Sequence, residues 1–222
     1  MLKKLAMKLK MMAGGQDRFD PATIGDPLAM QTEWKPAKGG GASFRTHKLV
    51  VAAVDRMEFR AAAGAKVFYL IFLLVGIGVL VGFTIAMISK GVASGGPALI
   101  VPILVGVVFT AAGGAMFYFG TAPIVFDTRK GYFWKGKKAP DEVFDSNRIK
   151  HLAKLETIHA LQLLSEYCRS DKSSYYSYEL NLVLQDGSRI NVVDHGNKTK
   201  LREDAATLSE FLGRPVWDAI QR

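Results

Sequence analysis

Cysteine is almost absent from this 222-residue chain, which contains only Cys168. A single cysteine excludes an intramolecular disulfide and any metal cluster held by several cysteines. This usage fits a reducing compartment without proving one. The opening MLKKLAMKLKMM has basic residues but no continuous apolar core, so we predict no secretory signal.

Charged residues are absent from two long stretches, 67–89 and 91–126, although the chain has a formal net charge of +9. Segments 67–89 and 98–120 would each reach about 34 Å as a helix at about 1.5 Å per residue. That length crosses a hydrocarbon layer of about 30 Å. The alternative is a pair of buried core helices, but the rest of the chain is too short to cover two of them on all sides. We therefore predict a transmembrane helical hairpin over residues 64–121.

Basic residues flank this hairpin on one side. The connecting stretch SKGVASGGP offers only Lys90. Because positive residues favour the cytoplasmic side, both termini should be cytoplasmic. The aromatic residues at the start of the first span and the end of the second would then share one interface. The flanking basic residues are Lys48, Arg56, Arg60, Lys66, Arg129, Lys130, Lys135, Lys137 and Lys138.

Glycines interrupt both apolar spans. GIGVLVG looks like part of a nucleotide-binding turn, but such a turn leaves a strand and enters a helix, whereas this one lies inside an apolar span. Small residues let membrane helices approach closely. The pattern leaves open whether the partner is the other span or another subunit. The glycines predicted to pack are Gly78, Gly82, Gly106, Gly113 and Gly114.

The N-terminal region, 1–63, divides into three parts. Residues 1–12 have the pattern of an amphipathic helix on an anionic membrane, with a frayed terminus as the alternative. Residues 13–43 are rich in glycine, proline and polar residues and are predicted to be a linker. Residues 44–61 have a β-branched centre that favours a strand, either in the cytoplasmic domain or along the membrane interface.

The C-terminal region, 122–222, has the pattern of an antiparallel β-domain. Segments 124–126 and 132–134 predict one hairpin. Residues 178–185 predict a strand that ends in an Asp186-Gly187 type I′ turn. Despite its helix propensity, 155–168 is predicted to be mainly extended and paired with 178–185.

The last predicted element is a helix with an apolar stripe at Leu201, Ala205, Leu208 and Leu212. Thr199 should cap it, and Gly213 and Pro215 should end it.

Antiparallel strands closed by one amphipathic helix outline a pleckstrin-homology-like (PH-like) domain. The stretches IHALQLLSEYC, YYSYELNLVLQDGSRINVVDHGN and LREDAATLSEFLGRPVWD resemble uncharacterised bacterial two-span membrane proteins with such a domain. The resemblance covers about the last hundred residues plus the hairpin and contains no catalytic signature. It implies a membrane α+β fold: a two-helix transmembrane hairpin and a cytoplasmic PH-like domain with a C-terminal helix.

Catalytic and metal-binding motifs are not found. The sequence lacks a paired-histidine zinc helix, a nucleophile elbow and a phosphate-binding loop, so we expect no cofactor, no metal and no enzyme. Asp194 and His195 are adjacent, and two readings remain: residues that stabilise a turn, or a catalytic pair without an evident nucleophile. Cys168 fits a small packing residue.

A basic, aromatic hairpin is the best candidate site for a lipid or partner. Each cation near an anionic leaflet contributes about 1 kcal/mol. The interleaved aromatics could lie at the headgroup boundary, and the alternative is that the charges only set topology. The candidate residues are Arg129, Lys130, Tyr132, Trp134, Lys135, Lys137 and Lys138.

We therefore expect a non-enzymatic inner-membrane scaffold, adaptor or assembly factor whose domain binds a protein partner or anionic lipid. The stretch DKSSYYSY would be one contact surface. The alternative is a small accessory subunit of a transporter or other membrane enzyme complex, and a membrane-bound hydrolase would rest only on Asp194 and His195. Expected partners are the bilayer and a protein, with homo-oligomerisation left open. Nucleic acid is not expected, because the positive charge gathers around the spans.

Overall fold

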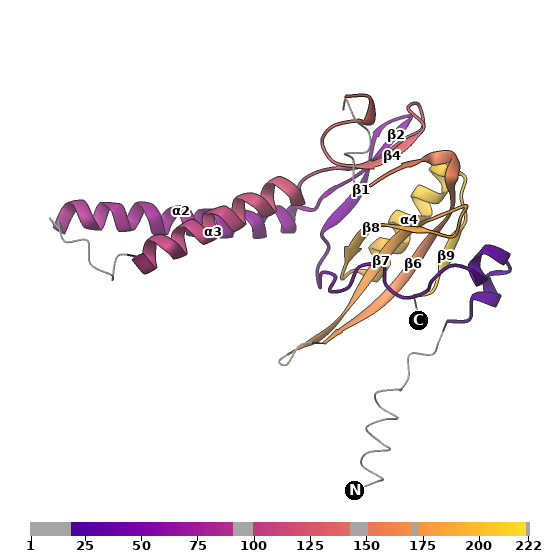
Figure 1. The fold of residues 1–222 in the computed structure, drawn as a ribbon, viewed down its shortest axis with the longest axis horizontal. Helices are drawn as coiled ribbons and strands as arrows, with labels where there is room; N and C mark the ends of the chain where they lie inside the picture. The colour runs from indigo at the N-terminus through magenta and orange to yellow at the C-terminus, as the bar shows by residue number, and fades with distance from the viewer. Residues whose placement is uncertain (1–18, 91–99, 143–150, 170–172, 221–222) are drawn as a thin grey trace, which may run out of the picture.

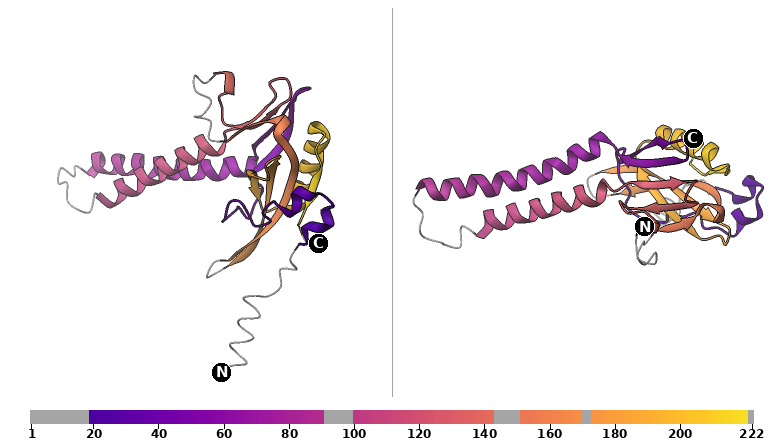
Figure 2. Two further views of the ribbon diagram at one scale, coloured as in Figure 1. Left: turned by 45° about the vertical axis from the view of Figure 1, so that its right-hand side comes forward. Right: turned by 90° about the horizontal axis from the view of Figure 1, so that it is seen from above.

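A computed structural model describes residues 19–90, 100–142, 151–169 and 173–220. Two apolar helices form a rod that projects from one end of a β-rich domain (Figures 1 and 2). The segments predicted as an amphipathic helix, 1–12, and as the tip of the hairpin, 91–99, lie outside the described residues.

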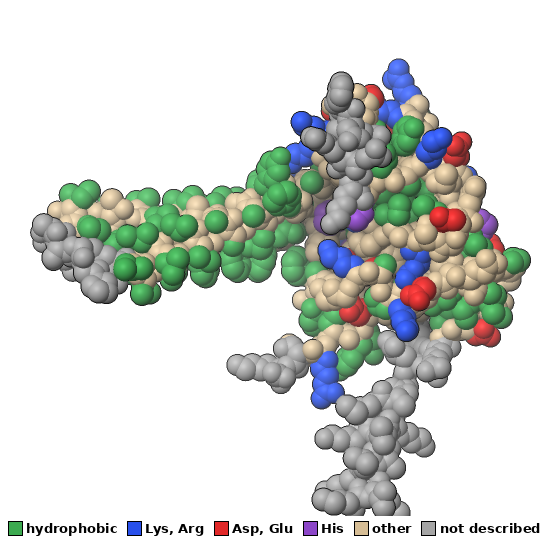
Figure 3. Space-filling view, viewed as in Figure 1, with side chains coloured by type: hydrophobic (Ala, Val, Ile, Leu, Met, Phe, Trp, Pro, Cys, Tyr) green, Lys and Arg blue, Asp and Glu red, His purple; other side chains and the backbone are tan. Residues whose placement is uncertain are grey.

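The rod consists of α2 (Ala63–Lys90) and α3 (Ile100–Gly120). Both helices are long and apolar enough to cross a membrane, and only 6% and 11% of their most apolar windows are buried. Core helices of a soluble protein would be mostly covered, whereas hydrophobic side chains line the visible face of this rod (Figure 3). Pro102 lies in the first turn of α3, where a missing N–H costs little.

The two helices meet through glycines, but not the whole predicted set. A Cβ on Gly76 would collide with Thr110, and one on Gly113 with the backbone of Leu73. Gly106 likewise lies against Leu80. A Cβ on Gly114 would meet only the Leu73 side chain, at 4.0 Å.

Gly78 and Gly82 do not pack on α3. A Cβ on either would meet nothing within 4 Å. They are one turn apart and lie away from the seam that Gly76 and Gly113 form. Of the two partners that the sequence left open, these two glycines therefore do not pack on the other span, and packing on another subunit stays a prediction. Gly76 takes their place between the two spans.

Sheet A combines strands that precede α2 in the sequence with strands that follow α3. Its strands are β1 (His47–Ala53), β2 (Arg56–Ala61), β3 (Ile124–Asp127), β4 (Tyr132–Lys135) and β5 (Leu152–Lys154), in that order and all antiparallel. The predicted hairpin of 124–126 with 132–134 is confirmed. Since β2 pairs with β3, residues 44–61 belong to the domain, and the expected boundaries at 63 and 122 do not separate two folding units. A 3₁₀ turn, η4 (Pro140–Glu142), follows β4.

Sheet B contains β6 (Ile158–Arg169), β7 (Ser174–Leu184), β8 (Arg189–His195) and β9 (Val216–Asp218), in the order β8-β7-β6-β9. The predicted pairing of 155–168 with 178–185 is confirmed from Ile158 onward, after a 3₁₀ turn, η6 (Leu155–Thr157).

The β7–β8 turn differs from the predicted type I′. Gly187 has φ 78°, whereas no described non-glycine residue has a positive φ, so Asp186 does not. Leu184 O accepts from Gly187 N, and Leu184 N donates to Ser188 O, each at 2.9 Å. These bonds define a type I turn with a glycine bulge.

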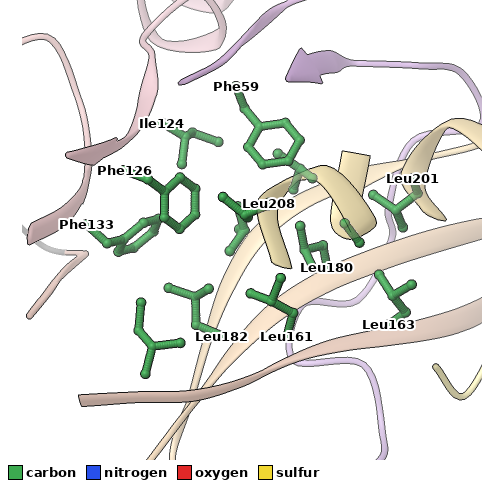
Figure 4. Close-up of a cluster of buried hydrophobic side chains, with 14 of the residues drawn as sticks. Phe59, Ile124, Phe126, Phe133, Leu161, Leu163, Leu180, Leu182, Leu201 and Leu208 are labelled. Atoms are coloured by element: carbon green, nitrogen blue, oxygen red, sulfur yellow. The ribbon is translucent and has the colours of Figure 1, made fainter. Parts of the chain in front are cut away.

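One core joins both sheets to α4 (Lys198–Leu212). Leu201 and Leu208 of α4 pack among the inward residues of sheet A and sheet B (Figure 4). The cap lies two residues before the predicted one: Asn197, not Thr199, caps the helix by accepting from Lys200 N at 3.0 Å. Gly213 ends it in the left-handed conformation, as predicted. The labelled core residues are Phe59, Ile124, Phe126, Phe133, Leu161, Leu163, Leu180, Leu182, Leu201 and Leu208.

The described part of the predicted linker is packed on the domain. It contains two 3₁₀ turns, η1 (Pro21–Ile24) and η2 (Pro27–Met30). Ala29 and Trp34 then pack with Ala160 and Trp217 of sheet B. The linker prediction is wrong here because its few apolar residues, widely spaced, cover the outer face of that sheet.

Candidate functional site at the foot of the domain

The helices leave the domain at one end, which we call the foot. Ala61 at the end of β2 precedes α2, and α3 leads into Ile124 of β3. The strand register places His47 opposite Ala61, and Lys135 opposite Ile124. His47 and Lys135 therefore lie at the foot.

The predicted basic hairpin is split between the two ends of sheet A. Tyr132 pairs with Asp127, at the end away from the foot, so the turn with Arg129 and Lys130 also lies there. At about 3.3 Å per residue, the strand separates its two ends by about 10 Å. Lys130 Nζ is moreover bonded to the Asp141 carboxylate at 2.6 and 2.7 Å. Only Lys135, Lys137 and Lys138 of the set belong to the foot.

The aromatic part of the prediction is also corrected. Trp134 is 1% exposed and packs with Val125 and Ala139, while the guanidinium of Arg56 lies 5.3 Å from its ring centroid. A side chain enclosed in this way does not reach headgroups. Tyr132 is partly buried beside this cluster.

The exposed aromatics near the foot are at the end of α3. Tyr118 and Phe119 are both exposed, and Lys137 Nζ lies 4.0 Å from the Tyr118 ring centroid. A cation over an aromatic ring is favourable, more so where water is excluded. Lys137 is therefore held beside the apolar rod.

A cavity of about 470 Å³ opens at the foot, and we call it the junction cavity. Tyr69 of α2, Phe119 of α3 and Ile124 of β3 contribute to its apolar side. Its polar side includes Lys135, Asn191 and Asp194. Residues of the loop 38–42 complete the wall. The cavity thus touches the rod, both sheets and the N-terminal segment.

Asn191 organises the polar side of the junction cavity. Its Nδ2 donates to Glu179 Oε1 at 2.7 Å and to Asp194 Oδ1 at 2.9 Å. Its Oδ1 accepts from Lys135 Nζ at 3.3 Å. Among the described residues, Lys135 has no carboxylate within the 4.0 Å of an ion pair. One cation and two carboxylates are thus linked through a neutral amide.

Burial shifts the titration of this group. It raises the pKa of Asp194 to about 6, with a smaller contribution from the Glu179 charge. It lowers the pKa of Lys135 to about 8, against the attraction of Asp194. His47 has its pKa lowered to about 4, first by burial and then by the Lys135 charge. Charges in this cavity are poorly hydrated, so they would attract ligand groups of opposite charge more strongly than charges in water do.

Two carboxylates of sheet B hold the loop beside the cavity. Glu179 accepts from Ala37 N at 2.8 Å and from Lys38 N at 3.0 Å. Glu166 accepts from Gly40 N at 3.0 Å and Gly41 N at 3.3 Å. Sequence reasoning missed this arrangement, because Glu179 alternates with Tyr178 and Leu180 and such a pattern predicts a solvent-facing side chain, whereas Glu179 is 2% exposed.

Asp194 and His195 do not face one another. Neighbouring strand residues point to opposite sides of a sheet. Asp194 lines the junction cavity, whereas His195 is 0% exposed and its Nδ1 accepts from Asn197 N at 3.2 Å. The bond to Asn197 supports the turn-stabilising reading for His195, and the geometry does not support a catalytic pair.

The remaining candidates lie elsewhere. In DKSSYYSY (171–178), residues 171 and 172 lie outside the described residues, and the tyrosines belong to β7. Tyr176 is 51% exposed and its ring lies 5.1 Å from that of Tyr167. Cys168 is a partly exposed free thiol rather than a core residue. Within the described ranges, no group of three His, Cys, Asp or Glu side chains could hold a metal ion.

Comparisons with protein-family models, with curated proteins and with solved structures return no match.

Proposed function

We propose that this chain is a non-enzymatic membrane protein whose α2 and α3 cross a bilayer and whose domain binds anionic lipid or a protein partner through its foot. One observation carries the proposal: the exposed apolar rod leaves the same end of the domain at which cations gather. Lys66 lies in the first turn of α2, and Lys137 and Lys138 follow β4 at the foot. Lys66, Lys137 and Lys138 are exposed. Cations in this place attract the headgroups of an anionic leaflet.

The orientation that best fits these cations has both termini in the cytoplasm. We take the membrane to be a bacterial inner membrane on the sequence resemblance alone. Two sheets and the helix α4 around one core support a PH-like domain as the binding module, although β9 follows α4 and pairs in parallel with β6. The domain would then act as a scaffold, adaptor or assembly factor that the rod anchors.

Cysteine labelling tests this topology directly. In a Cys168→Ser background, Val54→Cys reports on the domain and Ser94→Cys on the stretch between the helices. A membrane-impermeant maleimide should label only position 94 in cells with a permeabilised outer membrane, and only position 54 in inside-out vesicles. Labelling of both positions from the same side, or loss of the protein from carbonate-washed membranes, would contradict the proposal.

A second candidate function is an accessory subunit of a larger membrane complex. Gly78 and Gly82 favour it, because they form a face of α2 that α3 leaves uncovered. Another helix could approach closely there. Mass measurement after mild solubilisation decides: a monomer or simple dimer rejects this candidate, and a larger heteromeric complex supports it.

A further inference from the structure

The junction cavity has a position that restricts its ligand. Tyr69 and Phe119, which line it, come from the domain ends of α2 and α3. If the rod crosses a bilayer, as the proposed function states, the cavity lies at the boundary between headgroups and water. The ligand class with the easiest access to it is therefore a membrane lipid.

The cavity has the size and the two-sided lining of a site for an amphiphile. Small-molecule pockets measure roughly 300–1,000 Å³, and this one has about 470 Å³. Tyr69, Phe119 and Ile124 offer apolar contact on the side of the rod. Lys135 and Asp194 offer charge on the side of sheet B.

The charges inside the cavity are of both signs and do not neutralise one another directly. Lys135 and Asp194 each bond to Asn191 and have no ion pair with each other. Lys38, on the loop at the wall, is a second cation. A purely anionic ligand would satisfy the lysines but would meet the Asp194 carboxylate. A zwitterion can satisfy both.

We infer that the junction cavity binds the phosphoethanolamine headgroup of a membrane phospholipid. The phosphate oxygens accept from the ammonium groups of Lys135 and Lys38, and the headgroup ammonium donates to Asp194. A primary ammonium has three N–H donors, whereas the quaternary ammonium of choline has none. Asp194 therefore distinguishes ethanolamine from choline lipids, and the glycerol end of the lipid contacts Tyr69 and Phe119.

Native mass spectrometry of the delipidated full-length chain in detergent tests this inference. The protein is titrated with short-chain phosphatidylethanolamine, phosphatidylcholine and phosphatidylglycerol. We expect the ethanolamine lipid to bind about tenfold more tightly than either of the others, the effect of one charge-assisted hydrogen bond. Equal binding of the three lipids, or preference for phosphatidylglycerol, would overturn the inference.

Matched variants locate the site. Lys135→Met and Asp194→Asn should each weaken binding of the ethanolamine lipid about tenfold, and Asp194→Asn should remove the preference over the choline lipid. Lys130→Met, at the other end of the same hairpin, should bind as the wild type does. An equal loss in Lys130→Met would refute the assignment to the cavity.

Lys38→Met provides a variant on an exposed loop, where folding is not at risk. It should weaken binding several-fold, and wild-type affinity in this variant contradicts the assigned phosphate contact. Free phosphoethanolamine is the competitor that separates two sources of the same chemistry. If it binds as tightly as the lipid, the lipid assignment is wrong. A chain that integrates into membranes by cysteine labelling but shows no lipid preference refutes this inference and leaves the proposed function standing.

Discussion

Two histidines of the domain lie where their protonated form is disfavoured. Burial lowers the pKa of His195 to about 4, and the nearby charge of Arg45 adds to this effect. His47 is shifted in the same direction. Because the folded pKa lies below the usual 6.5, the unfolded chain binds more protons between about pH 6.5 and 4. Stability from these groups is intact above pH 6.5 and is lost as the pH falls through that window.

The substitution His195→Asn tests this directly, since its amide oxygen can replace Nδ1 as the acceptor for Asn197 N. We expect the free energy of unfolding to fall less steeply between pH 6.5 and 4, by up to about 1.4 kcal/mol per pH unit. Asp194, whose pKa is raised, also titrates in this pH range, but it is present in both proteins and so contributes to both slopes. Urea unfolding followed by tryptophan fluorescence reports on the domain, because all three tryptophans, Trp34, Trp134 and Trp217, lie in it. Identical slopes in the two proteins would show that His195 does not carry the effect.

At the scale of elements, the two helices pack through a short series of close backbone contacts. Gly76 and Gly113 lie at this seam, and Phe72 stacks on Phe109 with ring centroids 5.6 Å apart. Gly78 lies outside it. Spacing along the sequence predicted that glycines pack but could not identify which face of α2 meets α3. An almost wholly apolar helix has no polar side that would show how it is oriented.

Gly113→Val and Gly78→Val form a matched pair for the seam. The first places a side chain against the Leu73 backbone and should destabilise the hairpin by about 1–3 kcal/mol. The second meets no atom of α3, so its effect on the hairpin should stay within about 0.5 kcal/mol. Far-UV circular dichroism during an SDS titration in mixed micelles measures both. Equal destabilisation by the two substitutions would contradict this packing.

At the scale of the whole molecule, the domain is assembled from segments that the rod separates in sequence. The sequence predicted the rod, the longer strands of the C-terminal region and the helix α4, because each has its own local periodicity. It did not predict the three-residue strands β5 and β9. It did not predict that β2 pairs with β3. The two strands are separated in sequence by α2 and α3, and a local pattern does not identify so distant a pairing partner.

The candidate site was only partly predictable for the same reason. Charge composition identified Lys135 and Lys137, but the strand register decided that Lys135 lines a cavity and that Arg129 lies at the far end. Asn191 and Lys38 belong to no recognisable sequence motif, because their place in the site depends on contacts with segments distant in the sequence. Trp134 looked like an interfacial aromatic and is a core residue.

Depth-dependent quenching tests the central claim, that the rod lies in the bilayer with the foot at its surface. In the Cys168→Ser background, a fluorophore at Leu74→Cys, Lys137→Cys or Val54→Cys is combined with nitroxide-labelled lipids in vesicles. We predict strong quenching at position 74, weaker quenching at 137 and none at 54. An unquenched position 74, or quenching at 54 as strong as at 74, would contradict the account.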